Sequence, residues 1–498
     1  MEHPEAAQVA ALVGALGAIL VLLPRGRALP LAGFALLGLA TAGLARSLVS
    51  DDDLRLLFTD PLGIALLGVG ACAVVLAAIP LARYPAIVPV VLLAVAPFRV
   101  PVQLGREEAF LLLPLYFAIA AAVVALGYRV VTGVRHPAPP LLLALPLAAF
   151  VTFVSVSFLW TWDDRSGGIA LAFFLFPYTA GLATVARAPI ASWLPRALLV
   201  TLAALGSFFA VIGIWQAQTR TLFFARDVEV ANAYTTFFRV TSLFKDPSLY
   251  GRYLVIPMVV LLVAILLRRG RTVEWVALTA IVGLLFWGLF YSYSQSSFVA
   301  LFAAVFAIAL VGASRPIRMV LIACALLAAL AAGAFAAQAI EGQSAREVTS
   351  GRSRLVTVTL DAFQARPVAG VGIGGQPRAS TDESGTGSPS RNASHTTPLT
   401  VLAELGVLGF ALYAWLIGAV AWALWLVTKR DRMLGVGLAA VLGVLFAHSL
   451  LYAGFFEDPV TWGVLGLSAA LLAADPVASD LTVPEHEPRE SSPELLAH

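Results

Sequence analysis

The sequence predicts an all-α integral membrane protein with about 14 to 15 transmembrane helices. Of the 498 residues, 60% are hydrophobic and 12% are charged, and the mean hydropathy is +0.90. A soluble domain carries about 25% charged residues, so lipid must cover most of this chain. The apolar stretches show no sustained alternation of polar and apolar residues, which favours a helix bundle over an outer-membrane barrel.

A helix needs about 20 apolar residues to cross the hydrocarbon core of a bilayer. The stretch at 85–98 is short and bracketed by prolines, so it is the weakest of the predicted spans. We expect spans near residues 6–24, 29–46, 61–80, 85–98, 108–127, 139–160, 168–186, 194–216, 248–267, 274–291, 296–312, 317–337, 398–427, 433–454 and 459–474.

Charged residues in the short loops predict the orientation, because cytoplasmic loops carry an excess of Lys and Arg. Alternate loops hold Arg25/Arg27, Arg83, Arg129/Arg135, Arg187, Arg268/Arg269/Arg271, Arg315/Arg318 and Lys429/Arg430/Arg432. The loops between them hold Asp51–Asp53, Glu107/Glu108, Asp163/Asp164 and Glu457/Asp458. The basic loops therefore belong in the cytoplasm, and the acidic loops and the two long loops face out.

This pattern divides the chain into six segments. We expect an N-terminal transmembrane bundle at 1–216, an outer loop at 217–247, transmembrane helices at 248–337 and a large outer loop with short amphipathic helices at 338–397. C-terminal transmembrane helices follow at 398–474, and an acidic, disordered cytoplasmic tail at 475–498.

Arginine and lysine also gather in or beside the two long outer loops, where the orientation rule does not apply. This placement has two interpretations, a solvated surface and a cationic site for an anionic substrate. Arginine suits a diphosphate because its planar fork donates two hydrogen bonds at once and stays charged. The basic residues are Arg220, Arg226, Arg239, Lys245, Arg252, Arg346, Arg352, Arg354, Arg366, Arg378 and Arg391.

The first segment with candidate chemistry is 239–259. Asp246 followed by Pro247 has the pattern of a helix start. Arg252 then lies about one turn inside the span, where snorkelling to the interface is the simpler interpretation. Basic and aromatic groups nevertheless converge on this helix start, with Arg239 on its N-terminal side.

The second segment is 345–378. After Arg352 the apolar spacing predicts an amphipathic helix at the membrane surface, which ends before Arg366 because Pro367 follows. The glycines at 370, 372, 374 and 375 then predict a flexible turn whose amides are open to phosphate. As a dinucleotide motif this turn is weak, because no strand precedes it and no helix clearly follows.

The third segment is 392–410, where His395 precedes a helix capped by Thr396 or Thr397. Among six histidines, His395 alone is outward-facing and next to the basic loops, and its titration range suits a general base. His448 lies within a span, where a hydrogen-bonded packing role is expected. Glu404 is costly in an apolar helix, so it is a functional candidate or a brace for a neighbouring helix.

The acidic loop at 50–56 raises the question of a metal. Asp51 and Asp53 have the chemistry of divalent-cation ligands, but a capped helix start in an acidic external loop explains them equally. We therefore assign no metal ligands.

These segments resemble the O-antigen ligase and O-antigen polymerase family of bacterial membrane glycosyltransferases. The resemblance covers about 239–410 and rests on three pieces in the expected order. They are Arg239 with Asp246-Pro247-Ser248, then Ser350-Gly351-Arg352 with Arg366-Pro367-Val368-Ala369-Gly370-Val371-Gly372, and then His395 with Leu402-Ala403-Glu404-Leu405-Gly406-Val407-Leu408-Gly409. Two positions depart from the family pattern: Thr396 replaces an asparagine after the histidine, and Gln295 removes a cation.

The resemblance implies a GT-C-like, metal-independent, inverting glycosyltransferase that uses a polyprenyl-diphosphate-linked glycan and no cofactor. His395 would be the catalytic base, and the diphosphate would bind the four arginines Arg239, Arg252, Arg352 and Arg366. Asp246, Glu404, Gly370 and Gly372 would support the site. The implied partners are the lipid-linked donor, a glycan, lipid or protein acceptor, the bilayer and other envelope polysaccharide assembly proteins, without nucleic acid.

Several alternatives stay open on these residues. The motifs do not separate a polymerase, which joins two lipid-linked glycans, from a ligase, which transfers the glycan to another acceptor. A membrane transporter or channel for small anions or glycans is the alternative from another class, and discontinuous helices at mid-membrane would favour it. The expected location is the bacterial cytoplasmic membrane, with the site on the extracytoplasmic side and the C-terminus in the cytoplasm.

Overall fold

A computed structural model describes residues 1–474 except 2, 25, 27, 52–58, 105–106, 268–270, 313–314, 317, 320–351 and 386–387. The predicted span at 317–337 and the C-terminal tail therefore lie largely or wholly outside the described residues. The first half of the chain forms α1 (Pro4–Leu22), α2 (Ala28–Leu48), α4 (Pro61–Arg83), η1 (Pro85–Ile87), α5 (Val88–Val95), β1 (Val100–Leu104), β2 (Glu107–Leu111), α6 (Leu113–Val131), α7 (Leu141–Ser157), η2 (Phe158–Trp160), α8 (Asp164–Ala170), η3 (Leu171–Leu175), α9 (Phe176–Val185) and α10 (Leu194–Thr219).

The second half continues the helical bundle and adds the short helices of the two long loops. Its elements are α11 (Arg226–Asn232), α12 (Pro247–Leu267), α13 (Thr272–Phe290), α14 (Gln295–Gly312), α17 (Arg352–Ala365), α18 (Gln376–Ser384), α19 (Pro389–Asn392), α20 (Thr397–Arg430), α21 (Arg432–Ser449) and α22 (Pro459–Ala473). The described part contains 11 helices long and apolar enough to cross a membrane, and three shorter apolar ones at Pro85–Val95, Gln295–Leu310 and Pro459–Ala473. The predicted all-α membrane fold is confirmed.

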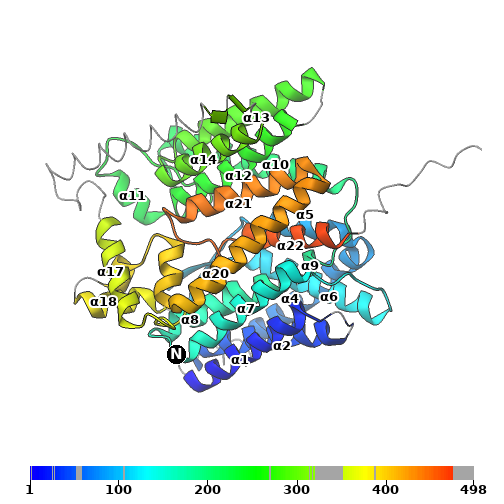
Figure 1. Cartoon of the computed structure of the whole chain (residues 1–498). Coiled ribbons are helices and arrows are strands. Elements are labelled where there is room, and N and C mark those ends of the chain that lie inside the picture. Colours follow the sequence, from blue (N-terminus) through cyan, green and yellow to red (C-terminus); the bar gives the residue numbers. More distant parts are fainter. Residues whose placement is uncertain are drawn as a thin grey trace, which may run out of the picture.

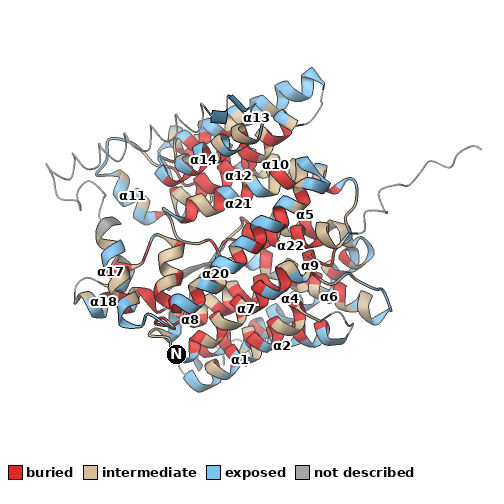
Figure 2. Cartoon of the chain, in the orientation of Figure 1, coloured by how far each residue is buried: buried red, intermediate tan, exposed pale blue. Residues whose placement is uncertain are grey.

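Burial separates central helices from peripheral ones (Figure 2). In its most apolar stretch α12 is 78% buried inside the protein, whereas α4 is only 11% buried. An apolar helix that leaves most of its surface uncovered needs lipid around it, and one that is buried on all sides lies at the bundle centre. The helix that carries Asp246 and Arg252 is therefore the central one.

Three arginines place several helix ends at the same end of the bundle. Arg129 donates to the carbonyl of Ala82 at 3.0 Å, and Arg187 donates to that of Val21 at 2.6 Å. Arg430 likewise donates to the carbonyls at the end of α22. These residues come from the loops predicted to be cytoplasmic, and they also satisfy the last carbonyls of neighbouring helices. At the opposite end of the bundle lie α11, α17 and α18 (Figure 1).

Two expectations near residue 100 need correction. The predicted span at 108–127 begins only at Leu113, because the antiparallel strands β1 and β2 precede it and pair Val100 with Leu111. The acidic pair at 107–108 belongs to the second strand, since a membrane helix cannot begin on two charges without cost. The helix at 85–98 is also shorter than predicted, because α5 ends at Val95.

The part of the predicted loop at 338–397 that the structure describes contains short helices, as predicted. Helix α17 begins at Arg352 and ends at Ala365, which are the bounds that the sequence indicates. The expectation that no helix follows the glycine turn is wrong, because α18 begins at Gln376. Pro377 stands in its first turn, where the missing amide proton costs nothing.

Helix α20 is interrupted at Gly406, whose φ of 64° and ψ of −167° are open essentially to glycine alone. The glycine turn occupies the gap that the interruption opens. Val407 donates to the carbonyl of Pro367 at 2.9 Å, and Leu408 donates to that of Val368 at 3.2 Å. A Cβ on Gly406 would collide with the carbonyl of Val368. The turn after α17 and the kinked helix are thus one packing unit.

Gly406→Ala should therefore lower the free energy of unfolding by about 2 kcal/mol or more. Gly418→Ala is the matched control, because Gly418 lies in the same helix with open space around its Cα, and alanine there should stabilise the helix by up to about 1 kcal/mol. Thermal unfolding in detergent measures both. Equal unfolding temperatures for the two variants would contradict the packing unit.

Candidate functional site

The glycine turn is rigid rather than open to a ligand. The amides of Gly370, Val371 and Gly372 donate to the carbonyls of Arg366, Ala403 and Glu404 at 2.8–3.0 Å. Each of the three glycines at 370, 372 and 374 has a positive φ, and a Cβ at any of them would collide with backbone. The prediction that these amides are free for phosphate is wrong, because carbonyls of the kinked helix and of Arg366 already accept from them. Gly370 and Gly372 support the site through packing.

The far side of the turn is held by η2 and the two residues that follow it. Thr161 donates its hydroxyl to the carbonyl of Ile373 at 2.8 Å, and the amide of Trp162 donates to Val371 at 3.0 Å. The Trp160 indole donates to the carbonyl of Ala369 at 3.3 Å. Segments separated by more than 200 residues therefore meet at this turn, a contact that the sequence analysis did not foresee.

Glu404 lies inside α20 and is 7% exposed. Its Oε1 accepts from the amide of Gln376 at 3.5 Å, at the first residue of α18. The Gln376 side chain in turn donates to Ser380 and to the carbonyl of Asn392. Glu404 thus braces the neighbouring short helix, which is one of the two roles expected for it.

His395 is exposed and lies at a bend in the short segment that leads from α19 into α20. The residues on both sides of it are fixed. The Ser394 amide donates to the Gln376 side chain at 2.9 Å, and Thr396 donates its hydroxyl to the carbonyl of Leu450 at 3.1 Å. Thr396 is also the N-cap residue of α20, as predicted. The backbone of His395 is therefore held between α18 and the end of α21.

A buried cation lies at this end of the bundle, the guanidinium of Arg252. Arg252 is 3% exposed, and its Nη1 lies 2.9 Å from Oδ2 of Asp458, whose side chain is 1% exposed. Its Nε and Nη2 reach Nδ1 of His448 at 3.3 and 3.1 Å, and Nη1 also donates to the carbonyl of Gly454. The predicted diphosphate contact of Arg252 stays a prediction, but each of its nitrogens already has a protein partner.

His448 extends this network to the first turn of α14. Because a guanidinium can only donate, Nδ1 of His448 accepts, and the proton of the neutral ring belongs on Nε2. Nε2 lies 3.2–3.3 Å from the hydroxyls of Ser296 and Ser297 and 3.2 Å from the carbonyl of Ser248. These contacts fit the hydrogen-bonded packing role expected of His448, and they join α12, α14 and α21.

The segment 450–458 is the element that this network holds in place. Tyr452 stacks under Arg252, with the guanidinium carbon 5.6 Å from the ring centre. Burial raises the pKa of the Tyr452 hydroxyl to about 12, with a further contribution from the charge of Asp246. Through Leu450, Gly454 and Asp458 the same segment contacts the start of α20 and the second turn of α12.

The other predicted residues lie around this segment. Asp246 caps α12, because its Oδ1 accepts from the amides of Ser248 and Leu249 at 2.6 and 3.2 Å. Arg239 is half-buried and donates from Nε to the carbonyl of Ser292 at 3.3 Å. The predicted helix start is confirmed.

The two arginines of the large loop belong to α17. Arg352 begins the helix, although its side chain lies outside the described part of the structure. Arg366 follows the helix and is exposed, with its guanidinium 5.8 Å from the centre of the Trp162 ring. An exposed arginine that rests on an aromatic face keeps its hydrogen-bond donors open to a ligand.

A cavity of about 80 Å³ lies directly beneath the start of α20. Thr397 and Thr400 line it on the helix that begins two residues after His395, and Glu404 and Glu457 add carboxylates. Phe150, Phe174 and Phe456 supply apolar walls. Hydroxyls, carboxylates and aromatic faces together are groups that can bind a sugar.

Asp458 is the functional candidate that the sequence analysis missed. In the sequence, Asp458 contributes only to the acidic charge of a short loop. The signal was nevertheless present, because Asp458-Pro459 repeats the Asp246-Pro247 pattern, and Oδ1 of Asp458 caps α22 through the amide of Val460 at 2.9 Å. The other carboxylate oxygen, Oδ2, accepts from Nη1 of Arg252.

A protein-family model described as O-antigen ligase matches residues 280–414. The matched stretch includes Arg352, Arg366, His395 and Glu404, and it ends before the segment 450–458. The match confirms the resemblance to this family over that part of the chain. No curated protein sequence matches the chain. The chain is thus a membrane protein with transmembrane helices that is similar to O-antigen ligases over residues 280–414.

Breaking the buried ion pair should cost far more than breaking an exposed one. Asp458→Asn leaves Arg252 without its counter-charge, so the free energy of unfolding should fall by about 3–5 kcal/mol. The pair Arg378–Asp382, at 3.9 Å and more than half exposed, provides the control: Asp382→Asn should change stability by less than about 1 kcal/mol. Chemical unfolding in detergent measures both.

Proposed function

We propose that this protein transfers a glycan from a polyprenyl-diphosphate carrier to an acceptor hydroxyl at the outer face of a bacterial inner membrane. The family match supports an O-antigen ligase or polymerase type of enzyme in polysaccharide assembly. The observation that carries the finer proposal is the placement of His395 and Arg366 on two segments that the same packing unit holds. Both are exposed at the end of the bundle where α17 and α18 lie.

The arginines act on the donor. Arg366, Arg352 and Arg239 offer the diphosphate positive charge and forked donors, and negative charge grows on the diphosphate as the glycosidic bond breaks. Diphosphate is already a good leaving group, so arginines can stabilise its developing charge without a metal. In this proposal Arg252 serves chiefly to hold the segment 450–458, because its own nitrogens have protein partners.

His395 acts on the acceptor. Its imidazole takes the proton of the acceptor hydroxyl while the oxygen attacks the anomeric carbon. The bond between that carbon and the diphosphate oxygen breaks on the opposite side, and its electron pair stays on the diphosphate. One displacement of this kind inverts the anomeric configuration. The cavity beside Thr397 and Glu404 is available for the sugar next to this reaction.

His395→Ala should lower the rate of glycan transfer by about 10²- to 10⁴-fold while leaving donor binding intact, because it removes only the base. The assay uses purified protein with a lipid-linked oligosaccharide and follows release of glycan from the carrier. His136→Ala, in the loop after α6 at the opposite end of the bundle, is the control. Transfer at the parental rate in His395→Ala would refute the assignment of the base.

Arg366→Ala should lower the transfer rate by about 10²-fold, in line with the loss of one charge-stabilising donor. Arg378→Ala controls for the general charge of the same loop, because Arg378 lies on α18 and faces Asp382. Equal losses in the two variants would show that the loop contributes only a diffuse positive field.

Metal removal should leave the rate unchanged. If arginines alone stabilise the leaving diphosphate, transfer measured in excess EDTA should equal transfer with added Mg²⁺ or Mn²⁺. A loss of activity in EDTA that Mg²⁺ restores would contradict the metal-independent form of the proposal.

A further inference from the structure

Two irregular helices meet at the cavity of about 80 Å³ beneath the start of α20. One is the span at Asp164–Val185, which winds into the π-helix η3 at Leu171–Leu175. The other is α20, which is interrupted at Gly406. Both irregularities contribute to the lining, for example through Leu171 and Leu405. A π-helical turn within a longer helix often marks a functional site, so this cavity has features that packing alone does not require.

The lining of the cavity contains a buried hydroxyl without a partner. Thr397, in the first turn of α20, is 6% exposed and lines the cavity. Its Oγ1 is buried and forms no hydrogen bond with any residue that the structure describes. Leaving a buried hydroxyl unpaired is costly. This group therefore points to a ligand that can pair with it.

Glu457 brings a carboxylate to the same lining, and because this residue is exposed, the cavity is open to water here. Oε2 of Glu457 and the guanidinium of Arg252 both lie within 4 Å of the point that a Cβ on Gly454 would occupy. That guanidinium is already paired with Asp458, and Glu457 forms no ion pair with any residue in the described part of the chain. The carboxylate of Glu457 is therefore left with its charge and available to a ligand.

The backbone on either side of this carboxylate is held in place. The Trp462 indole donates to the carbonyl of Phe456 at 2.8 Å, and the Tyr178 hydroxyl donates to that of Glu457 at 3.5 Å. Phe456 also lines the cavity, and its ring stacks on that of Phe150 at 4.8 Å. An aromatic face and a carboxylate are thus presented side by side in sequence from one constrained segment.

The charge of the lining selects among ligands. Its charged side chains, Glu404 and Glu457, are both acidic, and the lining contains no lysine or arginine. Carboxylates accept hydrogen bonds from hydroxyls, and a few polar groups among aromatic walls are typical of a small-molecule site. A cavity of about 80 Å³ holds about six waters, which suits one sugar ring better than a longer glycan. The chemistry therefore fits a single neutral sugar.

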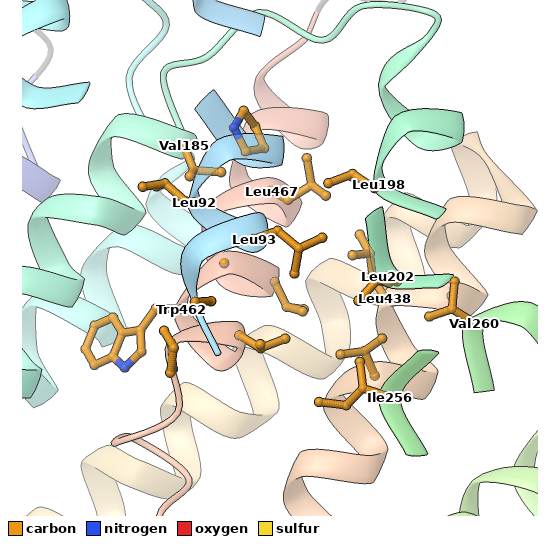
Figure 3. A pocket seen from close by; sticks show the side chains of 18 of the residues that line it. Leu92, Leu93, Val185, Leu198, Leu202, Ile256, Val260, Leu438, Trp462 and Leu467 are labelled. Atoms are coloured by element: carbon orange, nitrogen blue, oxygen red, sulfur yellow. The ribbon is translucent and has the colours of Figure 1, made fainter. Parts of the chain in front are cut away.

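A larger cavity in the described structure has a different character. Its volume is about 160 Å³, and Figure 3 shows that leucine, valine and isoleucine side chains dominate its lining. Its polar side chains, Tyr178 and Trp462, are the two that already donate to the carbonyls at 456 and 457. Of the two cavities, the smaller one therefore offers a sugar the hydrogen-bonding groups.

We propose that the smaller cavity binds the sugar residue of the acceptor that carries the attacking hydroxyl, and that Glu457 excludes acidic sugars from it. This inference deepens the proposed function and rests on it, because that function supplies an acceptor hydroxyl. The acceptor is assigned, and not the donor, because Thr397 follows the base His395 by two residues. The lining also offers a diphosphate no cation. The acceptor sugar is thus neutral, and a uronic acid is rejected.

The test compares methyl glucoside with methyl glucuronide, which differ only in the carboxylate at C6. Their affinities for the full-length protein in nanodiscs of phosphatidylcholine are measured by titration with saturation-transfer NMR, without donor. The parent should bind the glucuronide at least about tenfold more weakly than the glucoside, because like charges repel in a confined site. Equal affinities for the two glycosides, or no binding of the glucoside, would overturn the inference.

Glu457→Gln keeps the shape of the side chain and removes its charge. It should raise the affinity for the glucuronide about tenfold and change that for the glucoside much less, a gain that a misfolded protein cannot show. Asp382→Asn is the matched control, because Asp382 is an exposed acid of α18 outside the cavity lining. An equal gain in this control would assign the discrimination to the general charge of the outer loop and would overturn the role of Glu457.

Thr397→Val tests whether these sugars occupy this cavity. It removes one hydroxyl at constant shape, so it should weaken binding of both glycosides by a similar factor of about two to ten. Because that hydroxyl is unpaired in the ligand-free protein, the unfolding temperature should not fall. Unchanged affinities would contradict the assignment of the cavity, and a lower unfolding temperature would show a packing role for the hydroxyl instead.

A farnesyl-diphosphate-linked sugar separates the acceptor from the donor. Saturation transfer to the glucoside should persist when this donor analogue is bound, and displacement of the glucoside would show that the cavity holds the donor sugar. The two proposals fail in different ways. If the parent transfers glycan but Glu457→Gln keeps the parental preference, only the role of Glu457 is wrong. If Glu457 sets the preference but the parent transfers no glycan, the sugar site stands and the proposed reaction is wrong.

Discussion

The buried contact between Arg252 and Asp458 is the constraint on which the arrangement of this end of the protein depends. Two charges that are almost fully buried are stable only if they are paired and hydrogen-bonded. Here the pair also engages His448 and Gly454, so it ties the central helix α12 to α21 and to the start of α22. These contacts constrain the conformation of the segment 450–458. In this conformation the carbonyl of Leu450 accepts from Thr396, the N-cap residue of α20.

A second constraint comes from the interruption of α20 at Gly406. The interruption frees carbonyls and amides in the middle of a membrane protein, where water cannot satisfy them. The glycine turn after α17 satisfies them, and Glu404 holds the start of α18 from the same helix. Thus one defect in a long helix fixes the positions of Arg366 and His395. Arg366 and His395 are both exposed at this end of the bundle.

Much of this fold could be predicted from the sequence because a bilayer leaves few options. The span pattern, the bounds of α17 and the caps of α12 and α20 followed from hydropathy and helix-end chemistry. The pair of strands β1 and β2 did not, since the residues of β2 were read as part of a span that starts at 108. Local patterns also could not predict the hydrogen bonds of the glycine turn, because its amides donate to the carbonyls of Ala403 and Glu404 on α20.

The candidate site could be predicted only in part, for the same physical reason. Motif order indicated Arg239, Arg366 and His395, whose chemistry is local. Asp458 gains its significance from a partner far away in sequence, the buried guanidinium of Arg252. The partners of Arg252 likewise come from other helices, His448 from α21 and Asp458 from the start of α22. The sequence around the start of α12 gives no sign of them.

The most direct measurement is an experimental structure of the full-length protein in nanodiscs with bound polyprenyl diphosphate. The account predicts the diphosphate at the end of the bundle that holds α17, between Arg366 and the segment 450–458. The Arg252–Asp458 pair should stay intact, and His395 should lie within reach of the carbon that would carry the glycan. A diphosphate bound at the opposite end, beside Arg187 or Arg430, would contradict the account.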